Sequence, residues 1–304
     1  FNMTLHDRLG EPQYAENLRQ DGDFAHSLWL RVEDSHQRYD AINNQLRIDG
    51  HSTVVQLGHG IIHWSDNQNW RGRVGIMGAV GNQQFTSKSH RTGSRATANI
   101  DSAYSVGMYG TLYQNDENPL GTYVDTWALY NWYNNSVGMS GYSDAKYDSH
   151  GYNLSIETGH TWVFAKVVEK QREWQLQPQA QLTYGQLTSD AANSDSGLTI
   201  GKTKSASLES RLGARLTRVY NFKEGQSVQP FVEANWRHQF RDNTLTFNER
   251  YDFNNQPPKN RYELKVGVEG QRNKNLNGWA NISYSVGDKE YREPKAMIGI
   301  KYQW

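Results

Sequence analysis

The last nine residues, Ala296-Met-Ile-Gly-Ile-Lys-Tyr-Gln-Trp304, decide the fold. Apolar or aromatic side chains occupy every second position in this stretch, and the positions between them are mostly polar or glycine. Successive side chains of a β-strand point to opposite faces. The stretch therefore predicts a strand with one apolar and one polar face. Its apolar face consists of Ala296, Ile298, Ile300, Tyr302 and Trp304.

The same alternation recurs along most of the chain, for example in Trp174–Tyr184, Leu208–Tyr220 and Val232–Phe240. About twelve such segments can be counted, and they recur every 20–25 residues or so, which is longer than the 8–12 typical of a β-sandwich. A strand of about 9–11 residues can cross a bilayer when it is tilted, and bacterial barrels have an even strand number. We therefore expect an all-β fold, a 12-stranded antiparallel transmembrane β-barrel. The expected segments begin near residues 25, 46, 70, 97, 121, 147, 171, 203, 228, 258, 277 and 294.

The composition excludes several classes of protein. The chain has a net charge of zero and no cysteine, which argues against nucleic-acid binding, disulfides and thiol chemistry. Only 36% of the residues are hydrophobic, yet 12% are aromatic. This balance is typical of a barrel with a wet lumen and aromatic girdles at both membrane interfaces. We assign Trp64, Trp70, Trp127, Trp132, Trp162 and Trp174 to these girdles.

The first part of the chain has a different pattern. Residues 1–20 lack the alternation, and Leu5 and Leu9 have the spacing of one helix face, with Pro12 ending the helix. No signal segment follows Phe1, so we expect a mature fragment. A barrel of twelve strands is wide enough for one helix. We therefore divide the chain into a pre-barrel helix and linker that plugs the lumen (residues 1–24) and the barrel (25–304).

Two kinds of connection are expected between the strands. Short turns are assigned to Asn134-Asn135 and to residues 273–277, and long polar loops to residues 87–97, 189–204 and 248–259. Outer-membrane barrels have short periplasmic turns and longer external loops, so the connections fit that class.

Several blocks in the correct order resemble the autotransporter β-domain of type V secretion, in its AIDA-type and pertactin-type branch. They are Thr4–Gly10, Gln177–Leu182, Arg211–Arg215, Pro230–Trp236, Glu263–Gly270, Gly278–Asp288 and Gly299–Trp304. The resemblance covers essentially the whole chain. It implies a twelve-stranded barrel in the outer membrane of a Gram-negative bacterium, with an N-terminal helix threading the lumen.

The resemblance also implies a function and partners. Such a translocator anchors its own upstream passenger domain and exports it to the cell surface through the lumen, often in the service of virulence. The implied partners are the passenger, the outer-membrane barrel assembly machinery and the lipid and lipopolysaccharide bilayer, with the protein a monomer. We expect no enzyme activity, nucleic acid, metal or cofactor. The assembly machinery would read a signal formed by Ile300, Tyr302 and Trp304, although many relatives end in Phe.

Charged residues recur on the polar face of the strands and are expected to line the lumen. A wall of mixed charge hydrates a passing chain without binding it tightly, and it offers contacts to Asp7 and Arg8 of the helix. Glycines on the same face, such as Gly75, Gly107, Gly213 and Gly267, either leave room for an occupant or serve curvature and aromatic packing. The expected lumen residues are Arg31, Glu157, Glu173, Glu209, Arg211, Arg215, Glu233, Arg237, Glu263, Lys265 and Glu269.

A single intramolecular cleavage of the passenger is one candidate chemistry. It would need a carboxylate within hydrogen-bond reach of the scissile bond, and the nearest in sequence are Glu33, Asp34, Asp21 and Asp23. The alternative, which we favour, is that these are ordinary lumen or turn charges.

Two other functions remain open, a barrel enzyme (protease or phospholipase) and a passive porin. The ten histidines are scattered, and His59 and His63 are expected on one face of a strand rather than in a helical metal motif. A soluble lectin is a third and weaker alternative, since it would have to fold without detergent.

Overall fold

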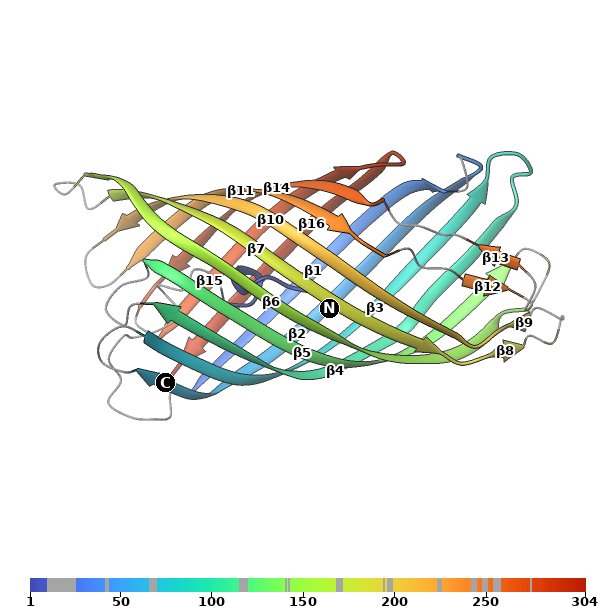
Figure 1. The fold of residues 1–304 in the computed structure, drawn as a ribbon, viewed down its shortest axis with the longest axis horizontal. Coiled ribbons are helices and arrows are strands. Elements are labelled where there is room, and N and C mark those ends of the chain that lie inside the picture. Colours follow the sequence, from blue (N-terminus) through green and yellow to red (C-terminus); the bar gives the residue numbers. More distant parts are fainter. Residues whose placement is uncertain are drawn as a thin grey trace.

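The structure, a computed structural model, describes residues 1–9, 26–41, 44–65, 70–114, 120–139, 141, 143–167, 172–193, 195, 199–222, 226–241, 245–247, 251–253, 258–273 and 275–304. Within these residues the chain forms one closed antiparallel barrel of twelve strands (Figure 1). Its strands are β1 (Ser27–Ala41), β2 (Leu46–Ser65), β3 (Trp70–Ser89), β4 (Arg95–Gln114), β5 (Gly121–Met139), β6 (Ala145–Val167), β7 (Arg172–Ser189), β10 (Thr203–Asn221), β11 (Ser227–Gln239), β14 (Asn260–Gln271), β15 (Leu276–Gly287) and β16 (Tyr291–Gln303).

The alternation in the sequence separates the two faces of the barrel wall. In β16, Ile298 is 62% exposed and Ile300 is 48% exposed, whereas Met297 and Lys301 point inward and are 4% and 0% exposed. Apolar side chains thus face outward and polar ones inward, the reverse of a soluble domain and the arrangement of a membrane barrel. The prediction of a twelve-stranded antiparallel transmembrane barrel is confirmed.

The first and last strands close the barrel. β1 pairs with β16 from Ser27 opposite Gln303 onward, so the barrel has no free edge. Just beyond the pair, the Trp304 amide donates to the His26 carbonyl at 3.1 Å, and the two rings stack with centroids 6.0 Å apart. Closure pairs the backbone groups of every barrel strand on both sides, as a lipid environment requires.

The two ends of the barrel differ. Short connections join the strands at the end that holds Trp304, which we name the Trp304 end. At the opposite end, residues 190–202 and 240–259 form longer connections (Figure 1). They contribute a small second sheet of β8 (Ala192–Asn193), β9 (Thr199–Ile200), β12 (Leu245–Phe247) and β13 (Tyr251–Phe253).

Two expected connections are wrong in detail. Asn134 and Asn135 lie inside β5, and most of residues 87–97 belongs to β3 and β4, which are joined by a turn with Gly93 at φ 72°. The strands β2–β7 and β10 extend beyond the apolar belt. Where both faces of a strand are polar the alternation disappears, so these stretches resemble loops in the sequence.

One helix, α1 (Leu5–Leu9), is enclosed by the barrel (Figure 1). Among the described residues, no helix is both long and apolar enough to cross a membrane.

Candidate functional site

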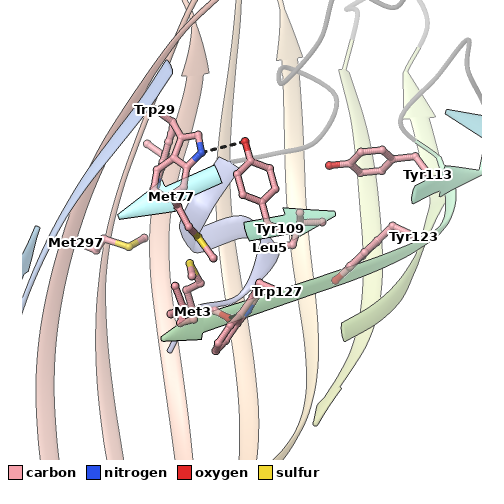
Figure 2. Close-up of a cluster of buried hydrophobic side chains, with 11 residues drawn as sticks. Met3, Leu5, Trp29, Met77, Tyr109, Tyr113, Tyr123, Trp127 and Met297 are labelled. Atoms are coloured by element: carbon pink, nitrogen blue, oxygen red, sulfur yellow. Dashed lines mark hydrogen bonds between the residues drawn. The ribbon is translucent and has the colours of Figure 1, made fainter. Parts of the chain in front are cut away.

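The helix α1 fills the lumen through a small apolar cluster. Met3 and Leu5 are 3% and 0% exposed, and they pack with Trp29, Tyr109 and Trp127 of the surrounding strands (Figure 2). The Trp29 Nε1 donates to the Tyr109 hydroxyl at 3.3 Å. Large aromatic side chains therefore close the space around the helix while their polar atoms remain hydrogen-bonded.

A reciprocal cap starts the helix. The Thr4 amide donates to Asp7 Oδ2 and the Asp7 amide donates to Thr4 Oγ1, both at 3.1 Å. This is the capping-box arrangement, with Asp in place of Glu or Gln, and it satisfies amide groups that a helix start leaves without partners. The Thr4-Leu-His-Asp7 spacing carries this signal in the sequence, in addition to the Leu5 and Leu9 spacing that predicts the helix.

Two ion pairs fix the helix to opposite sides of the barrel. Arg8 Nη2 lies 2.5 Å from Asp125 Oδ1 of β5, with both side chains 0% exposed, and the Arg8 guanidinium lies 4.1 Å from the centre of the Tyr109 ring. Lys265 Nζ of β14 donates to Asp7 Oδ1 at 2.9 Å. Separating either pair would leave a buried charge without its partner, which is costly.

The remaining helix contacts are neutral or combine a charge with an amide. The Leu5 amide donates to Glu157 Oε2 at 3.1 Å, and His6 Nε2 lies 2.5 Å from Gln177 Oε1. Burial, together with the charge of Arg215, lowers the pKa of His6 to about 3, so the docked imidazole is neutral. For Asp7, burial raises the pKa, but Lys265 and Arg31 hold it well below its ordinary value.

A buried charge network lies in the wall beside the helix. Arg211 Nη2 lies 3.1 Å from Glu157, and its Nη1 lies 3.7 Å from Glu233. Arg215 pairs with Glu233 at 3.5 Å and also with Glu269. All of these side chains are at most 3% exposed, so each charge has an opposite charge beside it, as burial demands.

Two of the four glycines named for the lumen face make room for aromatic rings of the wall, whereas Gly107 and Gly213 lie against Leu129 and Asn235. A Cβ atom on Gly75 would lie 2.4 Å from Tyr109, and one on Gly267 would lie 2.6 Å from Phe231. The same close approach joins Gly299 to Trp279, with 2.1 Å to Trp279 Cε2. These contacts favour the aromatic-packing interpretation at such positions.

Between the helix and the end opposite Trp304 lies a cavity of 520 Å³. On β2–β7 its lining residues are uncharged, and we name this set the neutral wall. On β10, β11, β14, β15, β16 and β1 the lining includes nine charged side chains, and we name this set the charged wall. The nine are Arg31, Glu33, Glu209, Arg237, Arg261, Glu263, Lys265, Glu293 and Lys295.

Every residue expected to line the lumen points inward. Glu173, Glu209 and Arg237 are half-buried. The fully buried ones are Arg31, Glu157, Arg211, Arg215, Glu233, Glu263, Lys265 and Glu269.

The four candidate cleavage carboxylates do not form a group. Glu33 lines the cavity, where it pairs with Arg31 at 3.2 Å and with Lys295 at 3.4 Å. Asp34 lies on the outer face of β1, 54% exposed, and contacts His51 and Thr53. Asp21 and Asp23 lie outside the described residues. Within the described part of the chain, Glu33 is thus the one candidate that faces the lumen.

The histidine pair is not on one face, contrary to expectation. The register of β2 against β3 shifts between Gly60 and Ile62, where an extra residue forms a β-bulge. A bulge reverses the alternation beyond it. His63 is therefore buried inside the barrel, whereas His59 stacks on Trp304 with ring centroids 6.1 Å apart. In the described residues, no group of three or more His, Asp or Glu side chains is placed to hold a metal ion.

Trp127 was assigned to an interfacial girdle, and this is wrong. It is 3% exposed and points into the lumen, where its Nε1 donates to the Met3 carbonyl at 3.2 Å (Figure 2). Trp127 lies two residues after Asp125 on β5 and so points to the same, inner face. This spacing in the sequence could have predicted the inward position of Trp127. Trp64, Trp70, Trp132 and Trp162 are exposed.

Comparisons with known proteins bear on the whole barrel. The family described as "Autotransporter beta-domain" matches residues 28–283. The chain is 37% identical over 312 aligned residues to uncharacterized protein YdeU of Escherichia coli (strain K12), covering 100% of this chain and 66% of that protein. It is 28% identical over 319 residues to the autotransporter adhesin AIDA-I of Escherichia coli, covering 100% of this chain and 24% of that protein.

A solved structure gives the same result. The crystal structure of the transport unit of the autotransporter AIDA-I from Escherichia coli matches with a TM-score of 0.84 and 26% identity, covering 100% of this chain and 94% of that chain. The chain spans 66% and 24% of the lengths of the two curated relatives, and nearly all of the AIDA-I transport unit.

Proposed function

The chain belongs to the autotransporter β-domain family and is an outer-membrane translocator barrel, and we propose that it conducts a passenger polypeptide through its lumen to the cell surface. The passenger's identity and activity belong to the whole protein. The two curated relatives are longer than this chain, which spans 66% of one and 24% of the other. The chain itself supplies the anchor and the passage.

One observation carries this proposal, namely that residues 1–9 occupy the lumen of a closed barrel. Leu5 and Arg8 are 0% exposed, so the segment is inside the wall and not on a rim. A chain that is covalently joined to the barrel and lies within it has the position that a passenger's end would have after transit.

The direction of transit follows from the two ends. Outer-membrane barrels place short turns in the periplasm and longer loops outside, so the Trp304 end faces the periplasm. Residues 10–25 join the helix to β1, which starts at the Trp304 end with Ser27. The cavity and Phe1 then lie toward the cell surface. This arrangement supports export with the polypeptide ahead of Phe1 leading outward.

We also propose the partners expected from the family. Ile300, Tyr302 and Trp304 are about half exposed on the outer face of the closing strand, where an assembly factor can reach them. The outward apolar belt would contact lipid and lipopolysaccharide, with the barrel a monomer. The division into a plug segment (residues 1–24) and a barrel (25–304) remains part of this proposal.

The test is surface display. An epitope-tagged passenger is placed ahead of Phe1 in a precursor with a signal sequence, and protease is added to intact cells. We expect the tag to be digested while periplasmic proteins survive. The matched control ends before Tyr291, lacks β16 and cannot close its barrel. A folded barrel whose tag stays protected from protease would overturn the proposal.

Two finer questions have separate tests. Unchanged processing of a precursor that carries Glu33→Gln would remove Glu33 from any cleavage role. For the porin alternative, single-channel recordings are compared with and without residues 1–20. A plugged translocator should conduct little until that segment is removed, whereas a porin should be open in both cases. An enzyme would require an activity of the isolated barrel that mutation abolishes.

A further inference from the structure

The charged wall of the cavity is internally paired. Arg237 Nη1 lies 3.2 Å from Glu209 and its Nη2 lies 3.7 Å from Glu263, while Arg261 also pairs with Glu209. Lys295 pairs with Glu33 at 3.4 Å. A passing chain would have to replace these partly buried ion pairs in order to bind here, and that exchange is unfavourable unless the new geometry is as good.

The neutral wall is chemically different. Its lining consists of hydroxyl, amide, glycine and a few apolar residues, such as Ser149, Asn153, Gln181 and Thr183. Amide and hydroxyl groups donate and accept hydrogen bonds without carrying charge. They can exchange partners with the backbone of an extended chain at little net free-energy change, whatever its side chains.

The beginning of the chain already lies on the neutral wall. Phe1 stacks on Tyr133 of β5 with ring centroids 6.3 Å apart and planes at 14°. Asn153 Nδ2 of β6 donates to Asn2 Oδ1 at 2.7 Å. Gln181 Nε2 of β7 donates to the Met3 carbonyl at 2.8 Å.

The hydrogen bonds at Met3 involve its backbone, while its side chain packs in the apolar cluster around the helix. Its carbonyl accepts from Gln181 Nε2 and from Trp127 Nε1, at 2.8 and 3.2 Å. Any residue in an extended chain offers the same carbonyl. The described hydrogen bonds and the ring stack of residues 1–3 are thus made with β5–β7.

We propose that the neutral wall is the track along which an extended polypeptide moves, and that the charged wall is a paired scaffold which the moving chain does not contact closely. This inference rests on the proposed export function and makes it more specific. The substrate class is an extended polypeptide held through its backbone, independent of sequence. The sequence predicts that a wall of mixed charge hydrates the moving chain. In this proposal the moving chain instead contacts the neutral wall.

The chain offers a matched test because it contains no cysteine. Ser149 of β6 and Ser285 of β15 line the same cavity from opposite walls and are 4% and 3% exposed. Thr183 of β7 and Asn281 of β15 form a second such pair, both 8% exposed. Each is replaced by Cys, one at a time, in a full precursor whose passenger carries one cysteine and is arrested in transit by a folded reporter domain.

A mild oxidant is added to accept the two electrons and two protons that the thiols lose, and the disulfide adducts between barrel and passenger are counted on gels. We expect S149C and T183C to give about ten-fold more adduct than S285C and N281C, the ratio that a preference of ~1.4 kcal/mol produces. Equal yields on both walls, or more adduct at S285C and N281C, would overturn the track.

The failure of the export proposal has a different signature. If the unarrested precursor never displays its passenger and all four variants lack adducts although the barrels fold, export itself is wrong and the track falls with it. If display occurs and the adducts are evenly distributed, export stands and only the track is wrong.

A rate measurement supplies an independent readout. Ser149→Glu places a charge on the neutral wall, and Ser285→Glu places one on the charged wall. We expect S149E to slow the appearance of the passenger at the cell surface about three-fold, because a carboxylate there binds Lys and Arg side chains of the moving chain. A three-fold change corresponds to ~0.6 kcal/mol. We expect S285E to slow the appearance of the passenger less. Equal slowing by the two variants would count against the track.

Discussion

Residues 1–3 and residues 5–8 occupy the same lumen but are held in different ways. The first three form a ring stack and neutral hydrogen bonds with β5–β7, and the Met3 side chain packs in the apolar cluster of the lumen. The helix α1 is fixed by ion pairs to both sides of the barrel, Arg8 with Asp125 and Asp7 with Lys265. The comparison indicates that the docking free energy is concentrated in one helical turn, whereas the leading residues make contacts that many chains could make.

The physical reason is the difference between charge and amide chemistry in a buried site. A neutral hydrogen bond contributes about 1 kcal/mol net, because water replaces it when it breaks. Breaking a buried ion pair by removing one partner costs about 3–5 kcal/mol, because the other charge stays buried. Changes in residues 5–8 should therefore release the plug, and changes around residues 1–3 should barely loosen it.

The largest effect is expected for Arg8→Met, which leaves the Asp125 carboxylate buried without its cation. We expect helix docking to weaken by about 3–5 kcal/mol, so that single-channel recordings show frequent opening. The matched control is the double variant Arg8→Met with Asp125→Leu, which replaces both charges by apolar groups and should restore most of the closed state. Equal open probabilities in the wild type and Arg8→Met would show that this pair does not hold the helix.

Asp7→Asn should have the next largest effect. Asparagine retains an oxygen for the Thr4 amide, so the helix cap survives and only the charge opposite Lys265 is lost. Lys265 keeps Glu233 at 3.8 Å. We therefore expect a loss of about 1.5–3 kcal/mol, the range for a hydrogen bond to a charged group. The same open-probability measurement decides, and an effect larger than that of Arg8→Met would reverse the proposed ranking.

Acid should release the helix through His6. Its pKa is about 3 when docked and 6.5 when free, so the released state binds more protons below pH 6.5. Docking is complete above pH 6.5 and weakens as the pH falls toward 3. At pH 5 the loss is about 2 kcal/mol, from ~1.5 pH units at ~1.4 kcal/mol each. Open probability should rise in recordings from pH 7 to pH 5, and a His6→Asn variant with the same rise would contradict this assignment.

The smallest effect is expected for Gln181→Leu, next to the leading residues. It removes one donor to the Met3 carbonyl, which keeps the hydrogen bond from Trp127. The acceptor that Arg211 Nε loses belongs to the barrel wall, whether the helix is docked or released. We expect about 1 kcal/mol or less and little change in conductance. A release as large as that of Asp7→Asn would mean that the neutral contacts hold the helix, and would contradict the view that the ion pairs of residues 5–8 hold it.

The strands could be predicted because their signal is local. Alternation in the sequence placed the start of β10 at Thr203 and that of β4 at residue 97, where the structure begins it at Arg95. The inward side of the charged residues followed from the same parity. The limits of β3 and β5 were missed, because beyond the membrane both faces of a strand meet water and no alternation remains.

The contacts within the lumen could not be predicted, because they depend on which strands face each other. Nothing near Arg8 in the sequence points to Asp125, and nothing near Asp7 points to Lys265. The bulge at Gly60 moved His63 to the inner face by a shift of one residue. The division into a neutral and a charged wall appears only when β2–β7 are placed opposite β10, β11, β14, β15, β16 and β1.

The pairing of β1 with β16 also distinguishes chains that have been synthesised through β16 from chains that end earlier. The two partners lie at opposite ends of the chain, from Ser27 opposite Gln303 to Arg38 opposite Arg292. A chain cut anywhere before Tyr291 leaves β1 with an open row of backbone donors and acceptors, which is a template for aggregation and intolerable in lipid. Only a chain that includes β16 can bury that row, so copies that end before β16 should be removed before they become pores.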